Sequence, residues 1–405
     1  MAARRAKSPR PAKPLPPFLK DDAPPPPPPP PAHEVIGLFN THSFVTDSIF
    51  PVLGGAFAAV ALPFVVVQIA ITTAWGGLYS RFPRYLPRVP AFGGALAADA
   101  RDDWLLPWAL WLAVVQPAAW LWLGRWAGPA PSWALLLGFN VVRIGPMYSN
   151  FAHVYTLCHM EAHRRYQLWG RRGPWGYAFN WWVGLFHGVL PGTFTASHLY
   201  NHHRFDNDVR DAYSTAGYPR DSIVSLLRYL VVWCFYATNL STLYDFYKRR
   251  MPLWFCHTAL GTAYYAGFVA LAVHATSARW ALWTIGYPLV EGNILLAVVN
   301  FTWHMFLEEG NEYVNSTTIE EGTEFIFSEE YHVVHHQAPG YHHTRYRAHY
   351  EKHRSKYDLV FEKCNLFELG FTAIFRNYER LRGFVKDPTP ETIDILKRRL
   401  RCTWW

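Results

Sequence analysis

Residues 50–75, FPVLGGAFAAVALPFVVVQIAITTAW, contain no charged side chain and consist almost entirely of apolar and small residues. A helix of about 20 such residues crosses the roughly 30 Å hydrocarbon core of a lipid bilayer. Four further stretches have the length and hydropathy of a spanning helix: residues 104–124, about 133–157, 253–275 and about 280–305. The sequence therefore predicts an all-α polytopic membrane protein.

Two other apolar segments are shorter or amphipathic and rich in Tyr and Trp, namely residues 181–195 and 223–247. Segments of this kind lie in the membrane interface, which is the interpretation preferred for both. The alternative is that each forms one more spanning helix. The predicted fold has four to six transmembrane helices with interfacial helices beside them.

The composition agrees with a membrane protein. Charged residues make up 17% of the 405 residues, against roughly 25% in soluble domains, and aromatic residues also make up 17%. Trp and Tyr are enriched where helices meet the membrane–water interface. The net charge of +8 is spread among loops without a basic helix or recognition motif, so it favours anionic lipid headgroups and argues against a nucleic-acid partner.

The chain divides into three parts. Residues 1–33 are basic at the start and contain eight consecutive prolines, so they are predicted to be disordered, with a targeting role as a possibility. Residues 34–375 form the predicted membrane catalytic domain, and residues 376–405 a cytosolic C-terminal tail. The five cysteines are scattered and form no C-x-x-C pair, which argues against a disulfide framework.

The distribution of basic residues predicts the orientation. Three loops are basic, and the opposite side carries only Arg125 and Arg279 in its short loops. Basic loops face the cytosol, and the chain beyond about residue 306 emerges on that same side. The basic residues of the three loops are Arg81, Arg84, Arg88 and Arg101, then Arg164, Arg165, Arg171 and Arg172, then Lys248, Arg249 and Arg250. In a eukaryotic cell, this predicts the endoplasmic reticulum or an organelle membrane, with all histidine-rich segments on the cytosolic side.

Three histidine motifs lie on that side: HMEAH at 159–163, HLYNHH at 198–203 and HVVHH at 332–336. Nineteen histidines in 405 residues would place on average fewer than one in these sixteen positions, yet eight are there. Helical residues three or four apart share a face, so each motif presents a convergent set of imidazoles. Eight ligands exceed the three or four of a tetrahedral zinc site, so two metal ions fit the count better.

This order of motifs resembles the membrane fatty acid desaturases and their hydroxylase relatives, over roughly residues 50–375. The resemblance implies a bundle of transmembrane helices under a cytosolic helical cap, with a histidine-ligated di-iron centre between them. It also extends to NFTWH at 300–304, where it implies a further ligand, His304, and a ligand that acts through water, Asn300. The remaining implied ligands are His159, His163, His198, His202, His203, His332, His335 and His336.

Four acidic residues beside the motifs are candidates to accept the outer N–H of a ligating histidine and fix its tautomer: Asp208, Asp211, Glu161 and Glu329. An equally open reading is that they cap or solvate loops. Glu161 stands at the third position of its motif, HMEAH. Many relatives instead carry an acid at the second position, directly after the first histidine. Arg143, inside the predicted span at 133–157, requires a partner or a water-filled cavity.

The function implied by the resemblance is that of an enzyme with two Fe ions that uses O₂ to desaturate a fatty acyl chain in the membrane. No catalytic residue is expected apart from the metal ligands. The sequence has no His-Pro-Gly-Gly haem motif, so electrons are expected from a separate protein of the cytochrome b5 or ferredoxin type.

Several alternatives remain open. Hydroxylation of fatty acyl, alkane or sphingolipid chains, or oxidation of a carotenoid ring, would use the same ligand set. A zinc-dependent membrane hydrolase or receptor would need only three or four of the histidines and a general base. A metal transporter would carry its ligands in the middle of the membrane, whereas these motifs lie at its surface.

Overall fold

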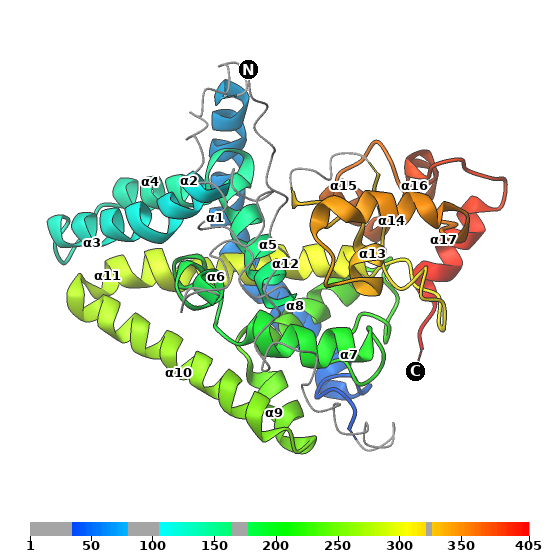
Figure 1. Ribbon diagram of the computed structural model, residues 1–405, viewed down its shortest axis with the longest axis horizontal. Helices are drawn as coiled ribbons and strands as arrows, with labels where there is room; N and C mark the ends of the chain where they lie inside the picture. The colour runs from blue at the N-terminus through cyan, green and yellow to red at the C-terminus, as the bar shows by residue number, and fades with distance from the viewer. Residues whose placement is uncertain (1–34, 80–104, 164–176, 321–325, 405) are drawn as a thin grey trace, which may run out of the picture.

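The computed structural model describes residues 35–79, 105–163, 177–320 and 326–404, and every regular element in these ranges is a helix (Figure 1). Extended pairing in these ranges is limited to three isolated bridges, Thr318 with Tyr331, Ile319 with Phe361, and Phe361 with Val385. The all-α class predicted from the sequence is confirmed. The proline-rich residues 1–33 and the basic loops at 81–101 and 164–172 lie outside the described residues.

The first predicted span is a single long helix. η2 (Val45–Ile49) continues into α1 (Phe50–Tyr79), and the stretch Val45–Gly76 is long and apolar enough to cross a membrane. Side chains such as Val52 and Val60 are 70% and 73% exposed. Such a surface is unfavourable in water and matches lipid hydrocarbon.

Two further candidate spans form a hairpin. The first is α10 (Pro252–Ala275), and the second is one continuous helix made of α11 (Ala278–Ala281), η9 (Leu282–Gly286) and α12 (Tyr287–Trp303). In the most apolar stretch of α10, 22% of the residues are buried inside the protein. The corresponding share for the helix that ends at Trp303 is 61%. Accordingly, α12 runs through the centre of the molecule and α10 along its outside (Figure 1).

A fourth crossing depends on a bent pair of helices. α8 (Ile223–Ala237) and α9 (Leu240–Lys248) are long and apolar enough to cross a membrane only when they are taken together. The angle between the two helices is 69°. Asn239 makes the bend with a left-handed backbone, φ 65°. The described residues therefore hold three candidate spans, or four if this pair crosses the membrane. α8 packs against both α1 and α12.

The predicted span at 133–157 is divided into two helices. α4 (Trp133–Ile144) ends at Gly145, which has φ 75°, and η5 (Pro146–Tyr148) leads into α5 (Ser149–His163). Glycine tolerates positive φ and Pro146 lacks the N–H that a continuing helix needs, so the chain turns here. The stretch at 104–124 forms α2 (Leu106–Leu110), η4 (Trp111–Val115) and α3 (Gln116–Trp126).

Residues 181–195, predicted to lie in the membrane interface, are divided among three short helical segments. They include the end of α6 (Ala178–Trp181), η7 (Val183–His187) and the start of η8 (Thr193–His202). Val183 and Leu185 are fully buried. Leu185 belongs to a cluster with Trp280 and Ile285, so this segment packs against the helix of the last span.

Arg143 of α4 finds its partner on α12. Its guanidinium is ion-paired with Glu291, and both side chains are fully buried. The Nε of Arg143 also donates to the side chain of Asn140, and the hydroxyl of Tyr148 donates to Glu291 at 3.4 Å. This buried cluster joins two helices whose residues are 148 positions apart in the sequence.

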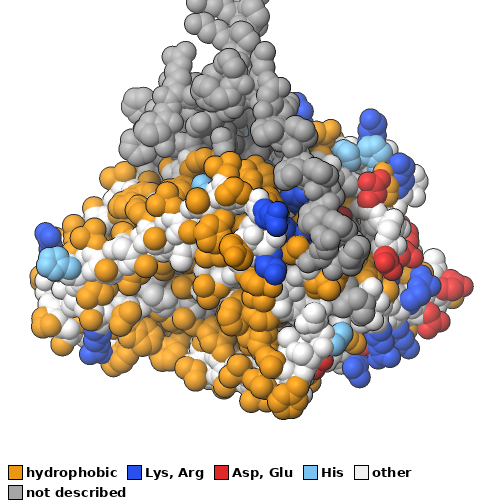
Figure 2. All heavy atoms as spheres, turned by 90° about the horizontal axis from the view of Figure 1, so that it is seen from below, with side chains coloured by type: hydrophobic (Ala, Val, Ile, Leu, Met, Phe, Trp, Pro, Cys, Tyr) orange, Lys and Arg blue, Asp and Glu red, His pale blue; other side chains and the backbone are white. Residues whose placement is uncertain are grey.

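Beyond α12 the chain forms a cap of short helices at one end of the molecule (Figure 1). They are α13 (His332–Gln337), η11 (His343–Arg345), α14 (Tyr346–Lys352), η12 (Arg354–Lys356), α15 (Leu366–Ile374), α16 (Tyr378–Phe384) and α17 (Thr392–Arg401). Figure 2 shows charged side chains gathered at the cap end and a broad apolar surface over the rest of this face.

Residues 376–401, which fall in the predicted tail, belong to the cap. Leu381 of α16 and Leu400 of α17 join the same apolar core as Phe301 of α12. Arg399 is ion-paired with both Asp358 and Glu308. The cap therefore packs on the C-terminal end of α12 and holds α13 beside that end.

Candidate metal centre

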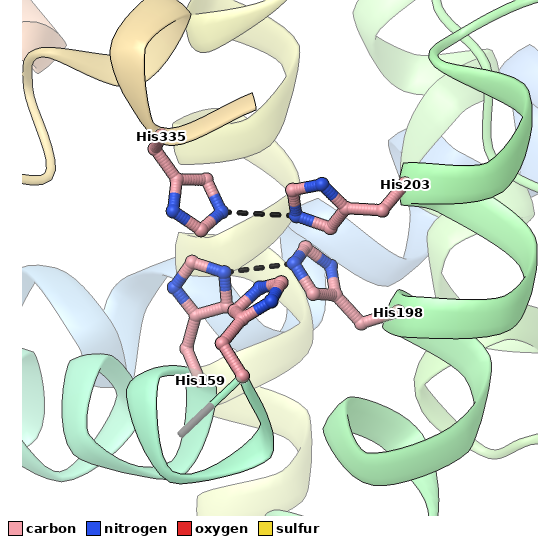
Figure 3. A group of neighbouring side chains, drawn as sticks. His159, His198, His203 and His335 are labelled. Atoms are coloured by element: carbon pink, nitrogen blue, oxygen red, sulfur yellow. Dashed lines mark hydrogen bonds between the residues drawn. The ribbon is translucent and has the colours of Figure 1, made fainter. Parts of the chain in front are cut away.

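Five histidines from three separate segments meet in a first group. Each offers a ring nitrogen, and the five nitrogens lie within 4.8 Å of one another. The group consists of His159 and His163 on α5, His198 on η8, His203 at the start of α7 (His203–Phe205), and His335 on α13. Figure 3 shows the labelled rings of His159, His198, His203 and His335 pointing toward one another.

Three further histidines form a second group: His202, His304 and His336. Their ring nitrogens also lie within 4.8 Å of one another, and each pair of ring centroids is 4.9 Å apart. The two groups adjoin, because the ring of His203 stacks on that of His336 with centroids 4.6 Å apart. All eight residues had been predicted as metal ligands from the sequence.

Two pairs of neighbouring histidines are divided between the groups. His203 belongs to the first group and His202 to the second, and His335 and His336 are divided in the same way. Neighbours on a helix point about 100° apart, so one turn can serve two adjacent sites. η8 is a π-helix, a geometry that is often found at functional sites.

Hydrogen bonds fix the tautomers of the second group. The Nδ1 of His202 lies 2.5 Å from Asp211, that of His336 lies 2.8 Å from Asp206, and that of His304 lies 2.9 Å from the carbonyl oxygen of Asn315. Carboxylate and carbonyl oxygens only accept, so Nδ1 carries the proton in all three rings. The lone pair is left on Nε2, and in all three residues Nε2 is buried without a partner among the described residues.

The first group follows a similar pattern with weaker acceptors. The Nδ1 of His159 lies 3.4 Å from Glu329, and the Nδ1 atoms of His198 and His335 each lie 3.1 Å from a tyrosine hydroxyl. Those hydroxyls belong to Tyr213 and Tyr346. The Nε2 atoms face inward in two close pairs, His159 with His198 at 2.7 Å and His203 with His335 at 2.9 Å.

These two groups fit metal ions. Burial and the neighbouring histidines hold the pKa of His163, His198 and His335 well below its usual range, and lower the pKa of His304 to about 3. The rings are therefore neutral, the form that ligates metal. Facing or unpaired Nε2 lone pairs in a buried cluster are unfavourable unless a cation lies between them.

Two predicted ligands stand apart from both groups. The ring of His332 stacks on that of Trp303, and its centroid lies 4.9 Å from the centroid of the His336 ring. Both ring nitrogens of His332 are buried without a partner among the described residues. It therefore lies beside the second group rather than within it. The Nδ2 of Asn300 donates to the hydroxyl of Tyr229 at 2.6 Å, so this amide is engaged by α8.

The four candidate acids have different surroundings. Asp211 accepts from His202, and Glu329 lies between the Nδ1 atoms of His159 and His335, at 3.4 and 3.8 Å. Asp208 is ion-paired with Arg210 and touches no ligand histidine in the described residues. Glu161 accepts from the backbone and side chain of Asn180, both at 2.9 Å, so it anchors α6 to α5.

Sequence reasoning missed two further acceptors, Asp206 and Asn315. Asp206 reaches His336 because the chain takes a left-handed turn at Asp206 and Asn207, with φ of 47° and 67°. The side chain of Asn315 donates to Asp206 at 2.7 Å while its backbone carbonyl accepts from His304. The nearness of Asp206 to its motif was a signal, but no local pattern pointed to Asn315.

A narrow, largely apolar pocket lies beside the first group. It is lined by Leu190, Phe194, Tyr236, Leu289 and Leu296 among others, and its free volume of about 20 Å³ has room for about one water molecule. The ring of Phe194 lies 5.8 Å from that of His159 and 5.9 Å from that of His198. One wall of the pocket therefore lies next to the first group, and a guest larger than water requires the lining side chains to move.

Comparison with known proteins agrees with this geometry. Residues 131–361, more than half of the chain, match the family described as Fatty acid desaturase. The chain has no significant match among curated proteins or among solved structures. The matched range includes all three histidine motifs and the helices that position them. The all-α polytopic fold, the two histidine groups and this match together identify the chain as a member of the fatty acid desaturase family.

Proposed function

We propose that the protein is a membrane-bound di-iron oxidoreductase that uses O₂ to desaturate a fatty acyl chain. The observation that carries the proposal is the pair of adjoining histidine groups, eight imidazoles whose Nε2 atoms face inward. Reduced iron together with O₂ supplies an oxidant strong enough to break an unactivated C–H bond, which zinc does not. Family membership supports a lipid substrate.

The protein's own groups hold the ligands in place. Asp211, Asp206 and the carbonyl of Asn315 keep the rings of the second group in the Nδ1–H tautomer. Glu329, Tyr213 and Tyr346 contact the outer nitrogens of the first group. Such contacts orient the rings and raise their strength as ligands. His332 and Asn300 are proposed to complete the coordination, which requires Asn300 to leave Tyr229.

The pocket beside Phe194 is the proposed site of the chain to be oxidised. It is lined mostly by apolar side chains of α8, α12 and the segment before η8, and Phe194 of its wall packs against the rings of His159 and His198. A chain held there lies in a water-poor site with one stretch of carbons next to the first group, and such fixed placement is a main source of catalytic rate.

Electrons are proposed to come from a separate protein of the cytochrome b5 or ferredoxin type. α14 supports an approach from the cap, because Tyr346 contacts His335 on its buried side while Arg347 on its outer side is 71% exposed. The proposed orientation places this cap in the cytosol, with the apolar helices in the endoplasmic reticulum or an organelle membrane.

Two other activities use parts of the same site. Hydroxylation of a fatty acyl, alkane or sphingolipid chain needs the same ligands and differs only in whether a second hydrogen is removed. A zinc-dependent hydrolase needs one group of three or four histidines and a general base, and it leaves half of the observed set without a role.

Metal content and lipid products test the proposal. The purified protein should contain about two irons per chain, measured by inductively coupled plasma mass spectrometry. Lipids of a host that expresses it should contain a product lighter by two hydrogens, absent from a host with a His202→Ala variant. A product heavier by one oxygen would show that the protein is a hydroxylase rather than a desaturase. One zinc per chain would refute the proposal of an oxidoreductase.

A further inference from the structure

The pocket beside the first group contains a polar residue that the proposed function does not use. Asn293 lies on α12 near the middle of the candidate span Ala278–Trp303, and it is 5% exposed. Its Nδ2 donates to the carbonyl of Leu289 at 2.8 Å, whereas its Oδ1 has no partner among the described residues. Because a carbonyl only accepts, the atom of Asn293 that faces Leu289 is the amide nitrogen. The unused acceptor is therefore Oδ1 of Asn293.

A purely structural role accounts for only half of this side chain. The bond to Leu289 satisfies one N–H of the amide within the helix, but a buried carbonyl oxygen without a donor destabilises a fold. Polar side chains inside membrane spans are rare and mark functional sites more often than not. Since Asn293 lines the pocket, the missing donor is best supplied by whatever occupies it.

Trp233 gives a second, independent observation. This residue of α8 lines the same pocket and is 7% exposed, and its indole Nε1–H has no acceptor among the described residues. Asn293 and Trp233 thus leave one acceptor and one donor unused in the wall, where the hydroxyls of Tyr155, Thr193 and Tyr236 have partners within the protein. A plain hydrocarbon satisfies neither group, a ketone satisfies only Trp233, and a hydroxyl can donate and accept.

We propose that the pocket binds a lipid chain that carries a hydroxyl group, and that Asn293 Oδ1 accepts the hydrogen bond of that hydroxyl. Trp233 Nε1 donates to a substrate oxygen in the same pocket. This inference rests on the proposed function in taking the pocket as the site of the oxidised chain. Along α12, Asn293 lies about 16 Å from His304, so several methylene groups separate the hydroxyl from the carbon that is oxidised.

Binding without turnover tests the inference. The purified full-length protein in detergent micelles is kept free of O₂, and its affinity for octadecanoic acids is measured by thermal shift. The acids are the plain chain and two series with a single hydroxyl or a single keto group at successive carbons. The best hydroxyl isomer should bind roughly tenfold more tightly than the plain chain, and the corresponding keto acid should fall between them.

Two variants assign the preference to its residues. Asn293→Leu should abolish the advantage of the hydroxyl acid over the keto acid, and Trp233→Phe should abolish that of the keto acid over the plain chain. Thr258→Val is the matched control, because Thr258 is also buried with an unpaired hydroxyl but lies on α10 outside the pocket wall. It should keep the full order of affinities.

The outcomes are distinct from those for the proposed function. Equal affinity for plain and hydroxylated chains at every position, or a hydroxyl preference that survives Asn293→Leu, would overturn the inference even if the protein contains two irons. If Asn293→Leu does not fold, equal binding of hydroxyl and keto acids by the unmodified protein overturns it. A protein that holds no iron but prefers the hydroxyl chain would refute the proposed function and support the inference.

Discussion

Two buried polar clusters of the molecule contrast in how complete they are. The cluster around Arg143 and Glu291 brings opposite charges together, with Asn140 and Tyr148 as further partners. The histidine groups bring together eight rings of the same kind, with several Nε2 atoms unpaired or facing each other. Both clusters are costly to bury. In the first, opposite charges of the chain pair with each other, whereas in the second the unpaired Nε2 atoms have no donor among the described residues.

The contrast teaches how a structural cluster differs from a site that binds a ligand. In the Arg143 cluster the guanidinium meets a carboxylate on a neighbouring helix, so removal of one partner leaves the other charge unpaired. In the second histidine group the outer nitrogens meet acceptors, while the Nε2 atoms present lone pairs that have no partner among the described residues. Such an arrangement is suited to hold cations in its centre, and substitutions should separate the two kinds of cluster.

The largest expected effect is that of His335→Ala. It removes a ring from the first group, which no nearby water can replace in donor strength, so product formation should be abolished and iron per chain should fall. His342→Ala is the matched control. The Nδ1 of His342 lies 2.8 Å from the Thr344 hydroxyl, and His342 belongs to neither group. It should keep both irons and a measurable fraction of activity, so equal behaviour of the two variants would refute the assignment of ligands.

Removal of one partner from the structural cluster should act on stability instead. Glu291→Ala leaves the buried guanidinium of Arg143 without its counter-charge, and breaking such a pair costs about 3–5 kcal/mol. Thermal melting in detergent should show a clear loss, whereas iron per folded chain should stay at two.

The double variant Arg143→Met/Glu291→Met is the control for this pair, because it removes both charges. It should recover most of the lost stability. A stable Glu291→Ala protein that lacks iron would place the Arg143 cluster in the metal site and break the comparison.

A smaller effect is expected for the carboxylate that supports His202. Asp211→Asn keeps the size of the side chain but removes the charge next to a ligand, and such changes lower metal affinity by about 10–100-fold. Iron retention against a chelator measures the effect. Asp208→Asn is the control, since Asp208 pairs with Arg210 outside the groups. Equal loss of iron in both variants would show that Asp211 acts through general charge rather than through His202.

The smallest effect is expected from the neutral partner of His335. Tyr346→Phe removes one hydroxyl at 3.1 Å from Nδ1, a hydrogen bond that contributes about 0.5–1.5 kcal/mol. The chelator titration should therefore show a loss of iron affinity of only a few fold. A loss as large as that of Asp211→Asn would mean that the hydroxyl and carboxylate acceptors support their groups equally.

The sequence predicted much of the site because motif spacing is local. The intervals within HMEAH, HLYNHH and HVVHH place imidazoles on common helix faces, and the structure brings seven of these eight histidines, all but His332, into the two groups, which His304 completes. Which group each histidine joins was not predictable. That division depends on the π-helical winding of η8 and on the left-handed turn at Asp206, which no spacing rule contains.

Hydropathy predicted α1, α10 and the helix that ends at Trp303, since long apolar runs with few or no charged residues have few other stable environments. The prediction of one spanning helix at residues 133–157 was wrong. Hydropathy averaged over many residues does not register a single turn such as the one at Gly145 and Pro146. The partner of Arg143 was also out of reach, because Glu291 is distant in sequence and is brought near only when α4 packs against α12.

The division of His202 from His203 and of His335 from His336 has a consequence for assembly. Two backbone segments each serve both groups, so an ion that orders one group also positions a ligand of the other. The first ion bound thus bears most of the entropic cost of ordering η8 and α13, and the second binds to segments that are already fixed. Loading is therefore expected to be cooperative, with chains that hold both metals or neither far more abundant than chains that hold one.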